Sequence, residues 1–335
     1  MELSQNELDK PLNLFYAEPD PDRWFKYDRY PRRIIRWIVR GKQRPGGVMT
    51  IAINLMKGLD KIGVPYRFND YKYIKKHPAE IACIIGKPHL LFDKKWENPI
   101  MLGAGIYSHP SDCPDLFQRY PHVKRFLVPG EWMRKMCEPF YGDKAKAWPV
   151  GIDTDYWQPF EGEKKFDFLI YDKVRWEHDK YEAELINPLT DILKKHHMSY
   201  QFIRYGNYSH HELIEKLKTS KAVIFLCEHE TQGLAYQQIL ASNTPILAWD
   251  RSGYWQDPEY YPARVKYQPV SSVPYWDERC GAKFTGAGDF EQNMELFVNA
   301  LERYRPRDYI MENLTLEICA QKYIDLHNEV EKELK

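Results

Sequence analysis

The sequence predicts an α/β fold with two domains, each built on a parallel sheet that is covered by helices. Its 335 residues suit about two domains. Short apolar runs of strand length alternate with segments of helical spacing, which is typical of parallel sheets. The clearest unit is residues 222–250, where an apolar run, a polar loop, a helix and a second apolar run follow one another. This order is that of a parallel βαβ unit.

The loop of this unit carries the residues that point to a ligand. Ligands of parallel sheets bind at the carboxyl ends of the strands, and this loop holds Glu228 and Glu230 at such an end. Backbone N–H groups at the start of the following helix can hold a phosphate, and Gly233 allows a close approach to the backbone. A carboxylate can accept hydrogen bonds from sugar hydroxyls. The pattern indicates a sugar diphosphate site, and the alternative is that Glu230 caps the helix.

Residues 230–246 resemble the donor-site signature of retaining GT-B glycosyltransferases of family four, roughly E-x-F-G-L-x-x-x-E-A-M-A-x-G-x-P-V. Glu230, Gly233 and Leu234 match the signature, and so do the Thr and Pro at its end. Gln232 replaces an aromatic residue. Gln238 replaces the second glutamate of the Glu-x7-Glu pair, which in the family binds the nucleotide ribose. Because glutamine still donates and accepts hydrogen bonds, we expect altered rather than lost nucleotide binding.

The resemblance implies two Rossmann-like domains that face each other across a cleft. It also implies an enzyme of the hexosyltransferase type (EC 2.4) that transfers a sugar with retained configuration and without a bound metal. The donor would be a UDP- or GDP-sugar, bound as a substrate, and no cofactor is expected. The Asp153-Thr-Asp155 sequence lies in a predicted linker, so it is not read as a metal site.

Strands are predicted in the first half at residues 12–16, 63–68, 81–85, 99–107 and 125–129, and apolar spacing predicts a helix over residues 48–62. Before that helix, Gly46 and Gly47 resemble the family's first-domain loop, which faces the donor diphosphate. His109 follows a predicted strand, where the family often has a histidine near the transferred sugar. The alternative for His109 is a structural role in the loop.

In the second half, strands are predicted at residues 166–171, 200–206, 222–226 and 245–249, and helices at 182–196, 234–242, 289–304 and 308–335. Residues 252–284 look irregular. Lys173 and Arg175 follow the first of these strands, and they are the nearest cations to those that neutralise the diphosphate in the family. The further donor contacts implied by the resemblance come from Gly206, Tyr208, Thr231, Gln232, Gly233, Leu234 and Gln238.

Residues 147–159 resemble the link between the two domains of this family. We therefore expect an acceptor domain at residues 1–152 and a donor domain at residues 153–310. The last segment, residues 311–335, would form a helix that packs back toward the first domain.

The acceptor is the least determined part of the prediction. Residues 1–150 hold 26 basic and 17 acidic side chains, whereas residues 151–335 hold 22 and 31. This asymmetry favours an anionic acceptor, or simply attraction between the two halves. The preferred acceptor is a glycan or glycolipid, and nucleic acid with hydroxylated bases is the alternative. The basic, aromatic segment 23–44 suggests peripheral contact with a membrane or acceptor, or packing on its own domain. A second alternative, suggested by Gln238, is a non-catalytic protein that binds nucleotide sugars or glycans.

Composition suggests a cytoplasmic protein. The sequence has no apolar run of transmembrane length, and its first residues lack a signal-peptide core. The six cysteines are scattered without the spacing of a metal site, which fits a reducing compartment.

Overall fold

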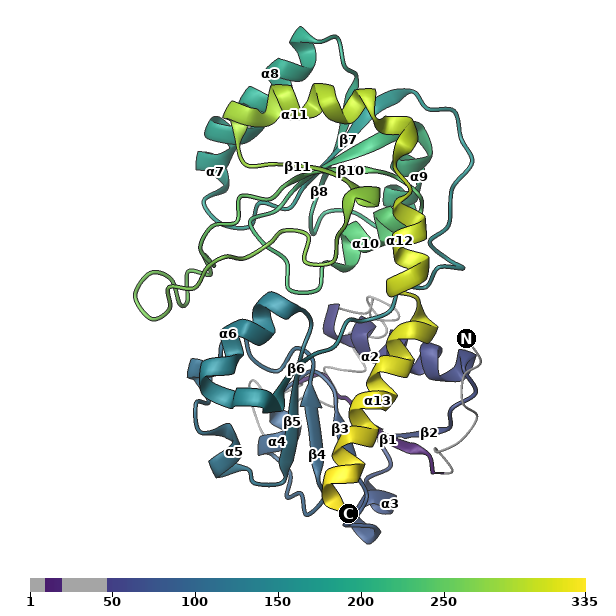
Figure 1. The fold of residues 1–335 in the computed structure, drawn as a ribbon, viewed down its shortest axis with the longest axis vertical. Coiled ribbons are helices and arrows are strands. Elements are labelled where there is room, and N and C mark those ends of the chain that lie inside the picture. Colours follow the sequence, from purple (N-terminus) through teal and green to yellow (C-terminus); the bar gives the residue numbers. More distant parts are fainter. Residues whose placement is uncertain (1–9, 20–46) are drawn as a thin grey trace, which may run out of the picture. The chain divides into compact units, whose positions relative to one another are not determined.

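The computed structural model describes residues 10–19 and 47–335, and their chain divides into two compact units (Figure 1). The described residues of unit 1 are 10–19, 47–129, 137–148 and 319–335. Unit 2 comprises residues 130–136 and 149–318. Each unit contains its own parallel sheet, as the sequence predicts.

The sheet of unit 1 has the strand order β2-β1-β3-β4-β5-β6, and all its neighbouring strands are parallel. The strands are β1 (Leu12–Phe15), β2 (Tyr66–Phe68), β3 (Ala82–Ile84), β4 (Ile100–Gly103), β5 (Val123–Val128) and β6 (Ala145–Ala147). The central strands β1, β3 and β4 are buried at every position. Continuous burial is expected because helices cover both faces of a parallel sheet.

In the described part of unit 1, helices connect these strands along the chain. They are α2 (Gly47–Lys61), α3 (Tyr71–Lys76), α4 (His89–Phe92), α5 (Leu116–Arg119) and α6 (Glu131–Tyr141), whose first six residues belong to unit 2. Helix α2 packs through Ile51, Ala52, Leu55 and Leu59, which repeat at helical spacing as predicted.

The sheet of unit 2 has the strand order β11-β10-β9-β7-β8, again all parallel. Its strands are β7 (Phe166–Asp172), β8 (Tyr200–Arg204), β9 (Ser220–Leu226), β10 (Ile246–Trp249) and β11 (Gly281–Phe284). Its helices are α7 (His178–Tyr181), α8 (Asn187–Lys195), α9 (His210–Thr219), α10 (Leu234–Ala241), α11 (Ala287–Asn299) and α12 (Pro306–Asn313).

The sheet of unit 2 buries both of its faces (Figure 1). On one face, Phe168 and Ile224 belong to a core that includes Leu189 of α8 and Phe290 of α11. On the other face, Phe225 contacts Tyr236 of α10, with ring centroids 5.7 Å apart. Successive residues of a strand point to opposite faces, so a run of apolar residues serves both cores.

Several elements differ from those predicted. The helix expected over residues 182–196 contains a π-helical turn, Glu182–Ile186, before α8. The helix expected over residues 308–335 is broken at Leu314 and Thr315, so that α12 ends and α13 (Leu316–Leu334) begins. Residues 319–334 of α13 belong to unit 1. Strands β6 and β11 were not predicted, because they are edge strands of three or four residues with few apolar side chains.

Gly281 begins β11 at the point where this strand lies against β10. Its φ is +140°, and a Cβ atom there would lie 2.0 Å from the carbonyl oxygen of Ile246. Gly281→Ala should therefore reduce the free energy of unfolding of unit 2 by about 3 kcal/mol. Gly288→Ala is the matched control, since nothing lies within 4 Å of its Cβ and alanine favours a helix. Urea unfolding of both variants measures the difference, and equal stabilities would contradict the strain.

Candidate functional site

The strand order of unit 2 places the predicted residues at one edge of its sheet. The chain runs from β7 to β8 on one side and then returns to β9 on the other side of β7. The carboxyl ends of β7 and β9 therefore lie at the point where the strand order reverses, which is where parallel sheets bind ligands. Lys173 directly follows β7, and residues 227–233, the β9–α10 loop, follow β9.

Lys173 and Glu230 form an ion pair in which both side chains are buried. The lysine side chain is 11% exposed and the glutamate side chain 6%. Burial disfavours the charged lysine, but the Glu230 carboxylate outweighs this effect, so the pKa of Lys173 is raised. On its other side, the Lys173 ammonium lies 4.4 Å from the ring centre of Tyr205, which follows β8. Three neighbouring strands thus each contribute one side chain to this cluster.

Glu228 holds the loop that carries Arg175. Its carboxylate is fully buried and accepts hydrogen bonds from the backbone N–H groups of Arg175 and Trp176, at 2.7 and 2.9 Å. The Arg175 guanidinium donates to the carbonyl oxygen of His229 at 2.7 Å. The loops after β7 and β9 are therefore joined, and Arg175 is held beside the β9–α10 loop. The sequence points to Glu228 as a carboxylate of a ligand-binding loop, whereas in the structure it holds the backbone of the loop that carries Arg175, a partner that nothing in the sequence shows.

His229 lies within an aromatic cage between the two glutamates. Its ring stacks on Trp176 at 5.2 Å and meets the edges of Trp132 at 5.8 Å and Trp255 at 6.4 Å. Its Nδ1 has no hydrogen-bond partner among the described residues. Burial and the cations Arg175, Arg251 and Lys173 lower the pKa of His229 to about 2. The imidazole is therefore neutral at every physiological pH.

The other predicted residues of the β9–α10 loop have different surroundings. Gln232 is buried, and its side chain accepts from the N–H of Val150 at 3.0 Å and donates to Gln237 at 2.9 Å. Its amide is thus engaged within the protein. Gly233 has φ +76°, and a Cβ there would collide with the ring of Tyr236. This close contact explains why glycine precedes α10.

Helix α10 begins directly after Gly233. Thr231 and Leu234 are partly exposed on either side of Gly233, and Gln238 is 8% exposed one turn further along the helix. The backbone carbonyl of Glu230 accepts a hydrogen bond from the indole N–H of Trp132 at 2.8 Å. The backbone N–H of Glu230 donates to the carbonyl of Ser271 at 2.9 Å. The backbone of the loop is therefore held on two sides.

Gly206 and Tyr208 lie after β8, at the same edge of the sheet. Gly206 has φ +85° with nothing within 4 Å of a Cβ, so its surroundings are open. The hydroxyl of Tyr208 is 2.6 Å from that of Tyr171, which is fully buried in β7. These residues belong to the same unit as Glu230, Lys173 and Arg175.

The remaining predicted residues belong to unit 1. His109 is 5% exposed, and its Nδ1 accepts from the N–H of Ser111 at 3.0 Å, which caps a short 3₁₀ helix, Pro110–Asp112. This contact fits the structural alternative for His109, and a place near the transferred sugar stays a prediction. Gly47 is exposed and begins α2. Gly46 and the segment 23–44 lie outside the described residues.

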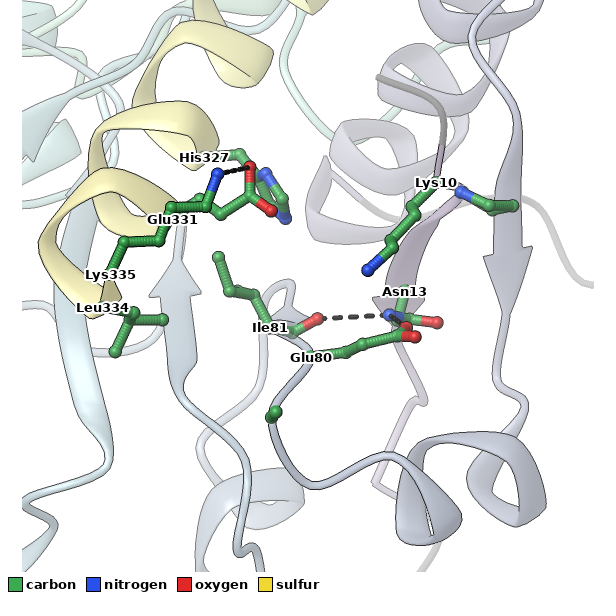
Figure 2. Close-up of a pocket in the computed structure, with 10 residues that line it drawn as sticks. Lys10, Asn13, Glu80, Ile81, His327, Glu331, Leu334 and Lys335 are labelled. Atoms are coloured by element: carbon green, nitrogen blue, oxygen red, sulfur yellow. Dashed lines mark hydrogen bonds and ion pairs between the residues drawn. The ribbon is translucent and has the colours of Figure 1, made fainter. Parts of the chain in front are cut away.

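A cavity of about 430 Å³ lies at the amino edge of the unit 1 sheet, the edge at which its parallel strands begin (Figure 2). It is formed at the start of β1, before β3 and along α13. Its lining residues are Lys10, Pro11, Asn13, Ala79, Glu80, Ile81, His327, Glu331, Leu334 and Lys335. Because Lys10 and Pro11 precede β1, and Glu80 and Ile81 precede β3, the cavity is at the amino edge of the sheet, and it includes none of the predicted site residues.

Two groups of side chains in the described part of unit 2 could hold a metal ion. One combines His178, Asp179 and Glu182, and the other His196, Glu291 and Glu295. In each group the ligand atoms lie within 4.8 Å of one another. Neither group contains a residue of the cluster around Glu230. No helix in the described ranges has the length and apolar character needed to span a membrane.

The sequence matches no protein-family model and no curated relative, but solved structures share the fold. Sucrose-phosphate synthase from Thermosynechococcus elongatus is 10% identical with a TM-score of 0.56, over 96% of this chain and 99% of that chain. The lipopolysaccharide outer core galactosyltransferase WaaB is 11% identical with a TM-score of 0.52, over 84% and 95% of the two chains.

A structure of S. aureus TarM with UDP and alpha-GlcNAc-glycerol is 15% identical, with a TM-score of 0.52 over 77% of this chain. The match covers 58% of the TarM chain, so this chain spans less than two thirds of that length. These are GT-B glycosyltransferases. At such low identity the comparisons establish the fold, and this chain has the GT-B fold that the sequence predicts.

The buried ion pair predicts a specific pattern of stability. Glu230→Ala leaves the Lys173 ammonium buried without its partner, so it should lower the free energy of unfolding by about 3–5 kcal/mol. The double variant Lys173→Met/Glu230→Leu should recover most of this loss, because no unpaired charge remains. Glu215→Ala, which breaks an exposed ion pair with Lys218, is the control and should change little. Chemical unfolding tests this, and a double variant less stable than Glu230→Ala would contradict it.

His229 predicts a loss of stability in acid. In the unfolded chain it binds a proton near pH 6.5, whereas the folded protein keeps it neutral down to about pH 2. The unfolded state therefore binds more protons between pH 7 and pH 5, and this residue alone removes about 2 kcal/mol of stability. His229→Phe keeps a ring in the cage and cannot titrate. Between pH 7 and pH 5 the variant should therefore lose about 2 kcal/mol less stability than the wild type. Urea unfolding at both pH values would disprove this if the two proteins lost equal stability.

Proposed function

We propose that this protein is a glycosyltransferase that moves a sugar from a nucleotide-diphosphate donor to an acceptor hydroxyl. The observation that carries the proposal is the cluster of Lys173, Arg175 and Glu230 at the carboxyl edge of the unit 2 sheet. The GT-B fold is consistent with it, and so is the resemblance of residues 230–246 to a donor-site signature. The neighbours described above include a galactosyltransferase and a TarM structure that contains UDP.

The cluster offers the two chemistries that a sugar diphosphate requires. Lys173 and Arg175 would bind the diphosphate oxygens together with the first N–H groups of α10. Glu230 would accept hydrogen bonds from the sugar hydroxyls. Because Glu230 and Lys173 already form an ion pair in the structure, the donor would bind across both groups and orient sugar and diphosphate relative to each other.

In the proposed reaction, the bond between the anomeric carbon and the diphosphate oxygen breaks. The acceptor oxygen forms a new bond to that carbon and passes its proton to the departing diphosphate oxygen, and the nucleoside diphosphate leaves. Negative charge grows on the departing diphosphate, and the fixed positive charges of Lys173 and Arg175 would stabilise it. We propose a transfer with retained configuration that needs no bound metal, as the resemblance implies, with a UDP- or GDP-sugar as donor.

The acceptor in this proposal is a glycan or glycolipid. The basic segment 23–44, on which a nucleic-acid acceptor or membrane contact was predicted, lies outside the described residues. No feature of the described residues favours nucleic acid over a saccharide.

A second candidate is a protein that binds nucleotide sugars without transferring them. Gln238, buried in α10, favours it, because an amide replaces the carboxylate that the family uses at the ribose. Incubation with each nucleotide sugar, followed by detection of free nucleoside diphosphate, separates the candidates. Tight binding with neither transfer nor hydrolysis would support the second one.

The proposal predicts that Arg175 contributes to donor affinity. Arg175→Ala should raise the Kd for a nucleotide sugar at least tenfold, because a charged hydrogen bond to the diphosphate is lost. The fold should persist, since Glu228 retains its two backbone donors. Lys221→Ala is the control, because this cation lies near the start of β9, at the opposite edge, and pairs with Asp167. Calorimetry with UDP-glucose, GDP-mannose and ADP-glucose measures both, and an unchanged Kd in Arg175→Ala would exclude its role.

A further inference from the structure

The connection between β10 and β11 departs from the rest of unit 2. Adjacent parallel strands are usually joined through a helix, but residues 251–276, the aromatic loop, contain no helix or strand. Only the short 3₁₀ turn Glu278–Cys280 precedes β11. Figure 1 shows this segment leaving the sheet and looping back. Long connections without regular structure are uncommon in compact domains and usually serve a function.

The aromatic loop is an ordered structure. The N–H of Trp255 donates to the carbonyl of Tyr267 at 2.8 Å, and the N–H of Val270 donates to the carbonyl of Gly253 at 3.2 Å, so the outgoing and returning segments of the loop are tied together. Trp255 and Tyr260 are buried and pack at 4.9 Å. Compact loops with close ends and a core of their own are frequently functional.

The aromatic loop is joined to the candidate site. The carbonyl of Ser271 accepts from the N–H of Glu230 at 2.9 Å, and the hydroxyl of Tyr267 donates to the carbonyl of Trp132 at 2.8 Å. Trp132 in turn donates to the carbonyl of Glu230. Asp250 accepts from the hydroxyl of Ser271 at 2.9 Å and fixes the base of the loop. The loop and the β9–α10 loop therefore form one connected structure within unit 2.

The outer part of this loop presents aromatic rings to solvent. Tyr254 is 38% exposed, and its ring lies 5.6 Å from that of Tyr261, which is partly exposed, with 32° between the ring planes. A tyrosine offers an apolar ring face and a polar hydroxyl edge at low conformational cost. A sugar ring has the complementary arrangement, with C–H groups on its faces and hydroxyls around its rim.

Charge distinguishes among partners for this surface. Residues 251–276 contain three basic and two acidic side chains, so the loop is nearly neutral. A surface for a polyanion would carry a clear excess of basic residues. The balance therefore favours a neutral saccharide over an acidic glycan or a nucleic acid.

We propose that the aromatic loop holds a neutral saccharide through Tyr254 and Tyr261, and that this saccharide is part of the acceptor. The inference rests on the proposed function and extends it, because it assigns acceptor binding to unit 2, whereas the sequence placed the acceptor domain at residues 1–152. The attachment of the loop to Glu230 through Ser271 would bring acceptor binding next to the candidate donor site.

The test measures binding of neutral tetrasaccharides, namely maltotetraose, cellotetraose and chitotetraose, by saturation-transfer NMR and titration. The wild-type protein should bind at least one of them, and Tyr254→Ala and Tyr261→Ala should each weaken this binding about tenfold. Tyr254→Phe should retain it. Tyr156→Ala is the matched control, because Tyr156 is 51% exposed elsewhere in unit 2, and it should bind as the wild type does.

Donor affinity, measured by calorimetry with the same proteins, separates this inference from the proposed function. We expect the loop variants to bind the nucleotide sugar normally. Three outcomes would overturn the inference, even if donor binding is intact. They are a wild type that binds none of the neutral tetrasaccharides, loop variants that bind them as well as the wild type does, and a hyaluronan tetrasaccharide that binds more strongly than they do. A protein partner captured through the same tyrosines without saccharide binding would also overturn it. Failure of the wild type to bind any nucleotide sugar, with saccharide binding retained, would count against the proposed donor site alone.

Discussion

A lysine and a glutamate that are both withdrawn from water offset the cost of burying their charges only while they stay together. Lys173 and Glu230 are in this situation, and the arrangement around them serves to keep them in contact. The two residues follow β7 and β9, which are neighbours in the sheet, so the parallel strands bring their side chains to one edge. The strand order of unit 2 therefore determines the chemistry of the candidate site.

The backbone around Glu230 is held from several directions, and this rigidity is what a catalytic or binding site requires. Trp132 and Ser271 bind the carbonyl and N–H of Glu230 itself. Glu228 anchors the loop that carries Arg175, and Gln232 joins the β9–α10 loop to Val150. Each of these contacts involves a buried polar group, and each such group would be costly to leave unpaired. The contacts are thus interdependent.

The polar and the aromatic side chains around Glu230 have different roles. The charged groups form the proposed donor site, whereas His229 lies among tryptophan rings, where burial and the neighbouring cations keep it neutral. Burial lowers the local dielectric constant and therefore strengthens the electrostatic interactions of Lys173 and Arg175. A fold shared at 10–15% identity does not define an activity, because function resides in the site. The proposed function accordingly rests on these side chains.

The sequence by itself determined the class of fold, most of the central strands and the position of Glu230 after a buried strand. These features are local: apolar runs reveal buried strands, and a polar loop with a glycine before a helix reveals the edge where ligands bind. Edge strands β6 and β11 escaped prediction because they bury few apolar side chains, and the break between α12 and α13 carries neither glycine nor proline. The tertiary structure alone decided which residues meet. Lys173 and Glu230 are 57 residues apart, Trp132 and Glu230 are 98 apart, and Gln232 and Val150 are 82 apart. Such contacts depend on the order in which strands pair, and local sequence patterns do not encode that order.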